Sequence, residues 1–156
     1  MKNNSKIKII SACLAGINCR YDGGSKPNQK VIELIKKGEA IPVCPEQLAG
    51  LTTPRTPAEE KDGKIITKNG KDLTKEFQKG AQEALKIAKS FNCKEAILKS
   101  KSPTCGCGKI YDGSFTGKLT SGDGVFTKLL KELNESNVNK PLSKIDDLTK
   151  ALVVVG

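Results

Sequence analysis

The sequence predicts an α/β fold: a single-domain, Rossmann-like open parallel sheet with helices on both faces. Short apolar runs alternate with longer segments whose apolar residues recur at helical spacing. Because this alternation is typical of a parallel sheet covered on both sides, it indicates βα units in series. A length of 156 residues suits one domain with its own core. We expect residues 1–156 to form one domain, with residues 141–156 as a C-terminal extension.

Short apolar runs supply the expected strands. The three main runs are residues 6–12, Ala40–Val43 and Ala96–Lys99. Pro42 weakens the second prediction, because proline removes a donor from the hydrogen-bond ladder. Near the C-terminus, Asn137–Asn139 is a candidate short strand, and Leu152–Val155 is a candidate strand or oligomer contact.

Three segments have the periodicity of amphipathic helices. They are Asn28–Lys37, the segment from Leu73 to Phe91, and Asp123–Leu133. Gly38 is expected to stop the first helix and Asp72 to cap the second. Ser143–Lys150 is a candidate for a further short helix.

The connections carry turn signals. Pro45–Glu60 is predicted to be a proline-punctuated loop with one helical turn at Gln47–Leu51. Lys61–Lys71 predicts a small hairpin that turns at Asn69-Gly70, a strong turn dipeptide. Ser102–Gly117, which is rich in Cys and Gly, is expected to be a loop.

Three of the six cysteines follow the three main expected strands. They are Cys13, Cys44 and Cys105. Carboxyl ends of parallel strands meet at one sheet edge, where open α/β folds bind ligands, so we expect these thiols to converge. Because the chain has no histidine, a transition-metal site must be built mainly from thiolates, which select iron–sulfur clusters, zinc or copper(I). Three thiolates without an obvious fourth partner leave one coordination position open, as catalysis requires.

The remaining cysteines leave alternatives open. No C-x-x-C knuckle occurs, which favours a cluster over a structural zinc without excluding zinc. Cys93 lies between a helix and a strand and is expected to be a buried hydrophobe. Cys19 and Cys107 are candidates for spare thiols, supporting groups near the metal or alternative ligands.

Two polar residues flank the candidate ligands in a way that suggests acid–base catalysis. Glu46 lies two residues after Cys44, and Ser102 lies three residues before Cys105. A proline beside each one fixes the local backbone. A carboxylate in a partly dry pocket can carry a raised pKa and so transfer a proton near neutral pH. The structural alternatives are a first-turn acid for Glu46 and a turn residue for Ser102.

Several stretches together resemble the small bacterial family that contains thiouracil desulfidase. The matching stretches span residues 11–16, 19–24, 42–46, 54–55, 99–106 and 110–113, in the same order and at similar spacing. This sequence departs from the family pattern in three places: Thr104 stands where serine is common, Cys107 adds a thiol, and Ala49-Gly50 replaces a glycine pair. Cys107 matters most, since it could compete with Cys105.

The resemblance implies a cofactor, a reaction and catalytic residues. Cys13, Cys44 and Cys105 would each ligate one iron of a 4Fe–4S cluster, whose fourth iron would bind the sulfur of a small thiolated substrate. Glu46 and Ser102 would be the catalytic pair that handles protons. The implied reaction is hydrolytic removal of sulfur from a thiocarbonyl, of the thiouracil-to-uracil type.

Composition limits the partners. The net charge of +10 is compatible with nucleic acid, but the lysines are scattered, arginines number only two, and there are four Phe and two Tyr for base stacking. We therefore expect no nucleic-acid partner. No apolar stretch approaches the ~20 residues that span a bilayer, and the N-terminal apolar run is too short for a signal peptide, so we expect a cytoplasmic protein without a membrane partner. The alternative functions are a cysteine-based redox or sulfur-carrier protein, and a structural-zinc or RNA-binding module.

Overall fold

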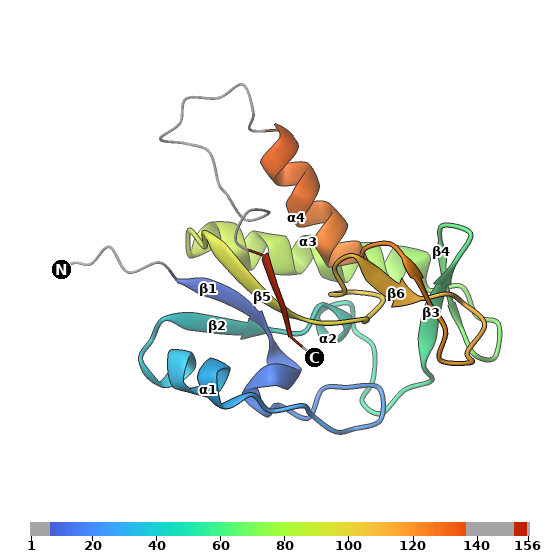
Figure 1. The fold of residues 1–156 in the computed structure, drawn as a ribbon, viewed down its shortest axis with the longest axis horizontal. Coiled ribbons are helices and arrows are strands. Elements are labelled where there is room, and N and C mark those ends of the chain that lie inside the picture. The colour runs from blue at the N-terminus through green and yellow to red at the C-terminus, as the bar shows by residue number, and fades with distance from the viewer. Residues whose placement is uncertain (1–6, 137–151, 156) are drawn as a thin grey trace.

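The central sheet has four parallel strands in the order β2-β1-β5-β8 (Figure 1). The structure, a computed structural model, describes residues 7–136 and 152–155. The strands are β1 Lys8–Ser11, β2 Ala40–Val43, β5 Glu95–Lys99 and β8 Leu152–Val155. The predicted open parallel sheet is confirmed, and the last apolar run is a strand of it. Pro42 is tolerated because β2 lies at the edge of the sheet.

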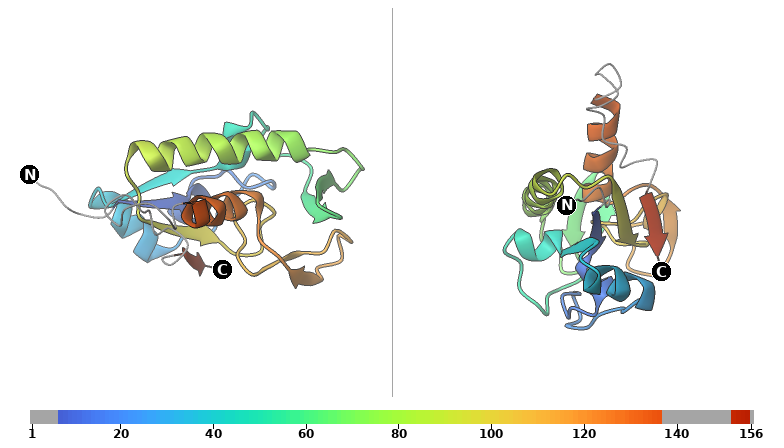
Figure 2. Two further views of the ribbon diagram at one scale, coloured as in Figure 1. Left: turned by 90° about the horizontal axis from the view of Figure 1, so that it is seen from above. Right: turned by 90° about the vertical axis from the view of Figure 1, so that its left-hand side faces the viewer.

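Helices cover both faces of this sheet, as predicted (Figure 2). Helices α3 (Thr74–Ser90) and α4 (Val125–Ser136) pack on one face, and α1 (Gln29–Lys36) packs on the other. The alternation of side chains along β1 divides the core in the same way. Ile9 belongs to the cluster with α3 and α4, whereas Ile10 belongs to the cluster with α1.

The start of α1 agrees with the prediction from the sequence, whereas the start of α3 differs from it. The Asn28 side chain accepts a hydrogen bond from the Val31 amide, which caps α1. The second helix was expected directly after Asp72, but α3 begins at Thr74. Asp72 instead accepts hydrogen bonds from the amide and the hydroxyl of Thr74, so its carboxylate closes a local turn before the helix.

A small antiparallel hairpin joins β3 (Ala58–Lys61) to β4 (Lys64–Thr67). The predicted turn at Asn69-Gly70 forms: the Thr67 amide donates to the Lys71 carbonyl at 2.8 Å, and Ile66 and Asp72 make an isolated antiparallel bridge. The longer pairing, of β3 with β4, was not predicted and turns at Asp62-Gly63. Both turn residues have positive φ, and Asp-Gly favours such a turn as strongly as Asn-Gly does. β3 escaped prediction because Ala58-Glu59-Glu60-Lys61 has no strand composition.

Two further differences concern the predicted loops. The segment after Val43 forms the one-turn helix α2 at Pro45–Leu48, two residues earlier than expected. The Cys- and Gly-rich segment contains β6 (Lys109–Tyr111), which pairs with β7 (Leu119–Ser121). A three-residue strand with mixed composition carries too little periodicity to be predicted. The candidate elements at 137–139 and 143–150 lie outside the described residues.

The described helices include none that is long and apolar enough to cross a membrane.

Candidate functional site

A pocket of about 390 Å³ lies at the carboxyl edge of the parallel sheet. β1, β2 and β5 are in register, so the segments that follow Ser11, Val43 and Lys99 leave the sheet side by side. The pocket is lined by all five predicted site residues, Cys13, Cys44, Glu46, Ser102 and Cys105. The predicted convergence of the three thiols on one edge is therefore observed.

Cys13 and Cys44 share a hydrogen-bonded group of thiols with Cys19. Cys13 lies in the 3₁₀ helix η1 (Ala12–Ala15), and Cys44 is the N-cap residue of α2. The Cys19 thiol hydrogen-bonds to both, which lowers the pKa of Cys13 and lowers the pKa of Cys44 to about 7, while the pKa of Cys19 rises. Cys19 thus stays protonated and supports two thiolates.

Cys105 occupies a different environment. Its side chain is buried, and burial raises the pKa of its thiol far above the ordinary value. A hydrogen bond to the hydroxyl of Ser11 acts in the opposite direction but does not overcome the burial. Without a positive group such as a metal beside it, this thiol stays protonated.

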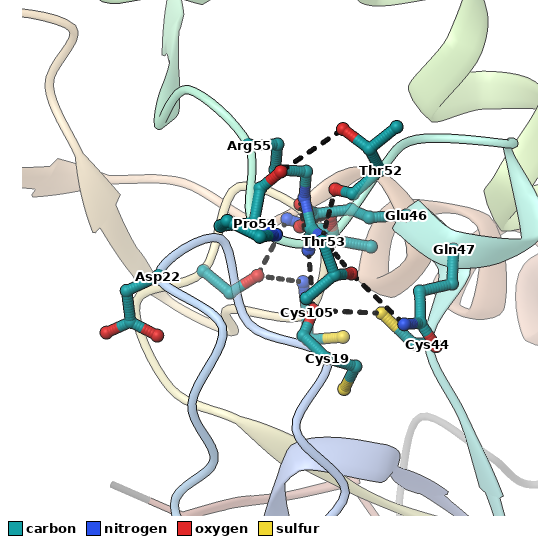
Figure 3. Close-up of polar contacts among 12 residues, drawn as sticks. Cys19, Asp22, Cys44, Glu46, Gln47, Thr52, Thr53, Pro54, Arg55 and Cys105 are labelled. Atoms are coloured by element: carbon teal, nitrogen blue, oxygen red, sulfur yellow. Dashed lines mark hydrogen bonds and ion pairs between the residues drawn. The ribbon is translucent and has the colours of Figure 1, made fainter.

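Glu46 lies in the first turn of α2 and is tied on both oxygens. Its Oε1 accepts a hydrogen bond from Nε of Arg55 at 2.9 Å and forms an ion pair with Nη2 at 2.9 Å, and its Oε2 accepts from the Thr104 hydroxyl at 2.7 Å. Figure 3 shows Arg55 bridging Glu46 and the loop of Thr52 and Thr53. The carboxylate is therefore held in a defined orientation at the pocket wall.

Ser102 follows β5 and organises the loop that carries Cys105. Its Oγ accepts from the backbone amides of Thr104 at 3.0 Å and Cys105 at 3.1 Å. The turn role that was left open is thus observed. Both lone pairs of the hydroxyl are then engaged, which leaves its proton for donation.

Two glycines let the walls of the pocket come close to the core. A Cβ at Gly80 in α3 would lie 1.9 Å from the carbonyl oxygen of Pro45, the first residue of α2. A Cβ at Gly124 would lie 2.3 Å from the carbonyl carbon of Thr104. Real Cβ atoms do not approach so closely, so each glycine permits one wall to sit where it does.

The other two cysteines lie elsewhere. Cys93 is buried in the core cluster beneath α3 and α4, in agreement with its prediction as a buried hydrophobe. Cys107 does not line the pocket, and its thiol hydrogen-bonds to Lys131.

Sequence reasoning missed the roles of Arg55 and Thr104. Arg55 could have been noticed, because it is one of only two arginines in a chain rich in lysine. Arginine is chosen where a fixed fork of donors is needed. Thr104 gave no such signal, since its partner Glu46 is 58 residues away in the sequence.

Comparison with known proteins places this site in a family. A sequence model of the 2-thiouracil desulfurase family matches residues 9–140. This chain belongs to that family. The uncharacterized protein YbbK of Bacillus subtilis (strain 168) is 42% identical, over 80% of this chain and 89% of YbbK. A solved structure of the [4Fe-4S]-dependent thiouracil desulfidase TudS is 43% identical with a TM-score of 0.77, and the match covers 83% of this chain and 86% of TudS.

The donor set of this family member suits a cluster of the kind named for TudS. The groups that converge are thiols, the ligands that iron–sulfur clusters use. Within residues 7–136 and 152–155, no three side chains of the metal-binding types are arranged to hold a single metal ion. A cluster makes a different demand, because each thiolate binds its own iron. Cys13, Cys44 and Cys105, from three separate segments around one pocket, fit that demand.

Proposed function

We propose that this protein is a 4Fe–4S-dependent desulfidase that hydrolytically removes sulfur from a small thiocarbonyl compound of the thiouracil type. The observation that carries the proposal is the meeting of Cys13, Cys44 and Cys105 with Glu46 and Ser102 in one pocket of a 2-thiouracil desulfurase family member. In the reaction, water adds to the thiocarbonyl carbon, a C–O bond forms and the C–S bond breaks. The products are the carbonyl compound and hydrogen sulfide, so no net electron transfer is required.

The three cysteines would hold the cofactor. Cys13 and Cys44 ionise readily, and the buried Cys105 thiol gives up its proton when iron binds. The bound cluster supplies an iron without a protein ligand, a soft Lewis acid that polarises a C=S bond. The role left to the rest of the chain is to orient the substrate and to move protons.

Glu46 is the proposed proton acceptor for the attacking water. Its side chain lines the pocket and is mostly buried, with 17% of its surface exposed. A general base must lie within hydrogen-bond reach of the proton that it removes, and a fixed carboxylate meets that condition better than a mobile one. The contacts of Glu46 with Arg55 and Thr104 support this role.

Ser102 is the proposed hydrogen-bond donor to the reacting group. Two backbone N–H groups occupy its lone pairs, so the hydroxyl can donate a hydrogen bond into the pocket but cannot readily accept one. The same contacts polarise the O–H bond. A donor at this position suits the sulfur or the carbonyl oxygen, which gains negative charge as water adds.

A small ring is the substrate class that the pocket favours. The volume of about 390 Å³ lies near the lower end of the range for small-molecule sites, about 300–1,000 Å³, and the cluster takes part of it. A single thiolated heterocycle is a better match for the remaining space than a polymer. The absence of a nucleic-acid partner and a cytoplasmic location stay predictions.

The test is anaerobic reconstitution followed by an assay of sulfide release. Protein loaded with iron and sulfide, then given 2-thiouracil, is expected to release one sulfide for each uracil formed. Iron analysis of the same sample is expected to give about four irons per chain.

The alternatives give different outcomes in the same experiment. Reductant-dependent thiol exchange without sulfide from any thiocarbonyl would favour a redox or sulfur-carrier protein. Colourless protein with stoichiometric zinc would favour a structural metal site. Tight, salt-sensitive binding to RNA would favour an RNA-binding module. Any of the three would contradict the desulfidase proposal.

A further inference from the structure

The Glu46 carboxylate has few open positions for a proton. An ionised carboxylate offers about four lone-pair sites over its two oxygens. Arg55 engages Oε1 through a hydrogen bond from Nε and an ion pair with Nη2, and the Thr104 hydroxyl occupies one site of Oε2. Among the described residues the guanidinium therefore covers Oε1 from two nitrogens, and the site left open is on Oε2.

Arg55 is itself fixed and cannot move away from Oε1 without loss. Besides the two contacts with Glu46, its Nη2 donates to the Cys19 carbonyl at 2.8 Å. Its Nη1 donates to the Thr52 carbonyl at 3.1 Å and to the Thr53 hydroxyl at 3.0 Å. With four hydrogen bonds and the ion pair, every nitrogen of the guanidinium is engaged. Arg55 is 10% exposed, so water offers little replacement for any of them.

Thr104 is held just as firmly on the other side. Its side chain is 2% exposed, its amide donates to Ser102 Oγ, and its carbonyl accepts from the amide of Phe126 at 2.9 Å. The backbone beside it packs against Gly124 at a distance that excludes a Cβ. The hydroxyl of Thr104 therefore points at Oε2 from a rigid loop.

We propose that Arg55 and Thr104 are positioning residues that leave the Glu46 carboxylate one open acceptor site, on Oε2, through which the reaction's proton passes. The inference rests on the proposed function. The proton that water loses as its oxygen bonds to carbon moves to Oε2, and the neutral carboxyl later gives that proton to the sulfur. The sulfur leaves as HS⁻ with the electron pair of the C–S bond, and the hydroxyl proton still on the attacking oxygen passes to solvent as the C=O bond forms. Atoms and charge then balance, and Oε1 takes no part because Arg55 occupies it.

The test compares two variants of cluster-loaded protein with 2-thiouracil as the probe. Thr104→Val removes the hydroxyl at nearly constant volume, and Thr104→Ser keeps the hydroxyl. Turnover is measured per bound cluster, so that any loss of iron is corrected. Thr104→Val is expected to lower kcat about tenfold or more with KM within about twofold, because a hydrogen bond to a charged group is lost. Thr104→Ser is expected to retain most of the wild-type kcat.

A double variant shows whether Thr104 acts through Glu46. If it does, Thr104→Val combined with Glu46→Gln falls no further than Glu46→Gln alone, because the effects of residues that act as a unit do not add. Unchanged kcat in Thr104→Val, an equal fall in Thr104→Ser, or additive losses in the double variant would each overturn the inference.

A crystal structure of cluster-loaded Thr104→Val tests positioning without reference to turnover. The Glu46 carboxylate is expected to rotate about its last bond and lose its fixed orientation. An unmoved carboxylate would overturn the positioning role. Wild-type protein that carries four irons and releases no sulfide would instead overturn the proposed function, while the crystal structure still decides on the role of Thr104.

Discussion

The two walls of the pocket each present a cysteine, in opposite environments. The α2 wall presents Cys44 as the cap of a one-turn helix, partly exposed, with a pKa lowered to about 7. The wall after β5 presents Cys105 on a buried loop, with its pKa raised by burial. Charged side chains brace the first wall, whereas the Ser102 hydroxyl and backbone groups brace the second.

The three thiols therefore differ in how readily they ionise. The hydrogen bond with Cys19 lowers the pKa of both Cys13 and Cys44, so these two thiols ionise more readily than an ordinary cysteine. Burial holds the proton on Cys105.

The largest expected effect comes from removal of a ligand on either wall. Cys13→Ser, Cys44→Ser and Cys105→Ser should each lose most of the iron, because a cluster cannot keep an iron without its thiolate. Iron and acid-labile sulfide per chain, measured after anaerobic reconstitution, check this. Cys107→Ser is the matched control and should keep the iron, since Cys107 bonds to Lys131 outside the pocket. If Cys107→Ser lost iron while Cys105→Ser kept all of it, Cys107 and not Cys105 would be the third iron ligand.

Substitution of the two proposed catalytic residues should affect iron content and turnover differently. Glu46→Gln should keep the iron and lose turnover by roughly a hundredfold or more, the range for general acid–base catalysis. Ser102→Ala should lose both, because its Oγ also holds the amides of Thr104 and Cys105. Visible absorbance measures the cluster content of each variant, and sulfide release from the same sample measures its turnover. Full turnover in Glu46→Gln would remove it from the mechanism.

Thiol alkylation should distinguish the two walls in reduced, iron-free protein. At pH 7, iodoacetamide should label Cys44 about tenfold or more faster than Cys105, because the thiolate is the nucleophile. The pKa of Cys44 is lowered, so its rate should rise with pH through about pH 7 and then level, while Cys105 stays slow. Mass spectrometry of the labelled peptides gives both rates. Equal rates would show that the two environments do not differ as described.

The smallest expected effect concerns the packing behind the α2 wall. Alanine usually stabilises a helix by about 1 kcal/mol relative to glycine. Gly80→Ala should instead lower the free energy of unfolding by about 1–3 kcal/mol, since its Cβ would collide with Pro45 and force a shift of α2. Denaturant unfolding of the iron-free protein measures this. Gln82→Ala, at an exposed position of the same helix, is the control and should change stability little. Stabilisation by Gly80→Ala would show that α2 can shift away from α3 without a cost in stability.

The sequence predicted the sheet and the convergence of the three thiols because both follow from local pattern. Apolar runs mark β1, β2 and β5, and in a parallel sheet the residue after each strand lands at a common edge. Cys13 and Cys44 could therefore be placed without coordinates. The hairpin at Ala58–Thr67 could not, because its first strand is polar and its turn competes with a second dipeptide of equal strength.

The supports of the site were the least predictable part. The bond between Thr104 and Glu46 joins residues 58 positions apart, and Arg55 reaches the carbonyl of Cys19 from 36 positions away. Such contacts depend on how the loops cross over the sheet edge. The periodicity of the sequence does not predict the paths of loops. The resemblance to a family supplied Glu46 and Ser102 as candidates; the groups that hold them came only with the fold.

Ser11 joins the sheet to the site through one hydroxyl. Its Oγ accepts from the Lys99 amide at 2.9 Å, just beyond Ile10 and Ile97, the last paired residues of β1 and β5. The same hydroxyl is hydrogen-bonded to the Cys105 thiol. Fraying of the strand pair at this end would therefore loosen the buried Cys105 thiol as well. The exchange rate of a single backbone proton, that of Lys99, becomes a gauge of how often this side of the pocket opens.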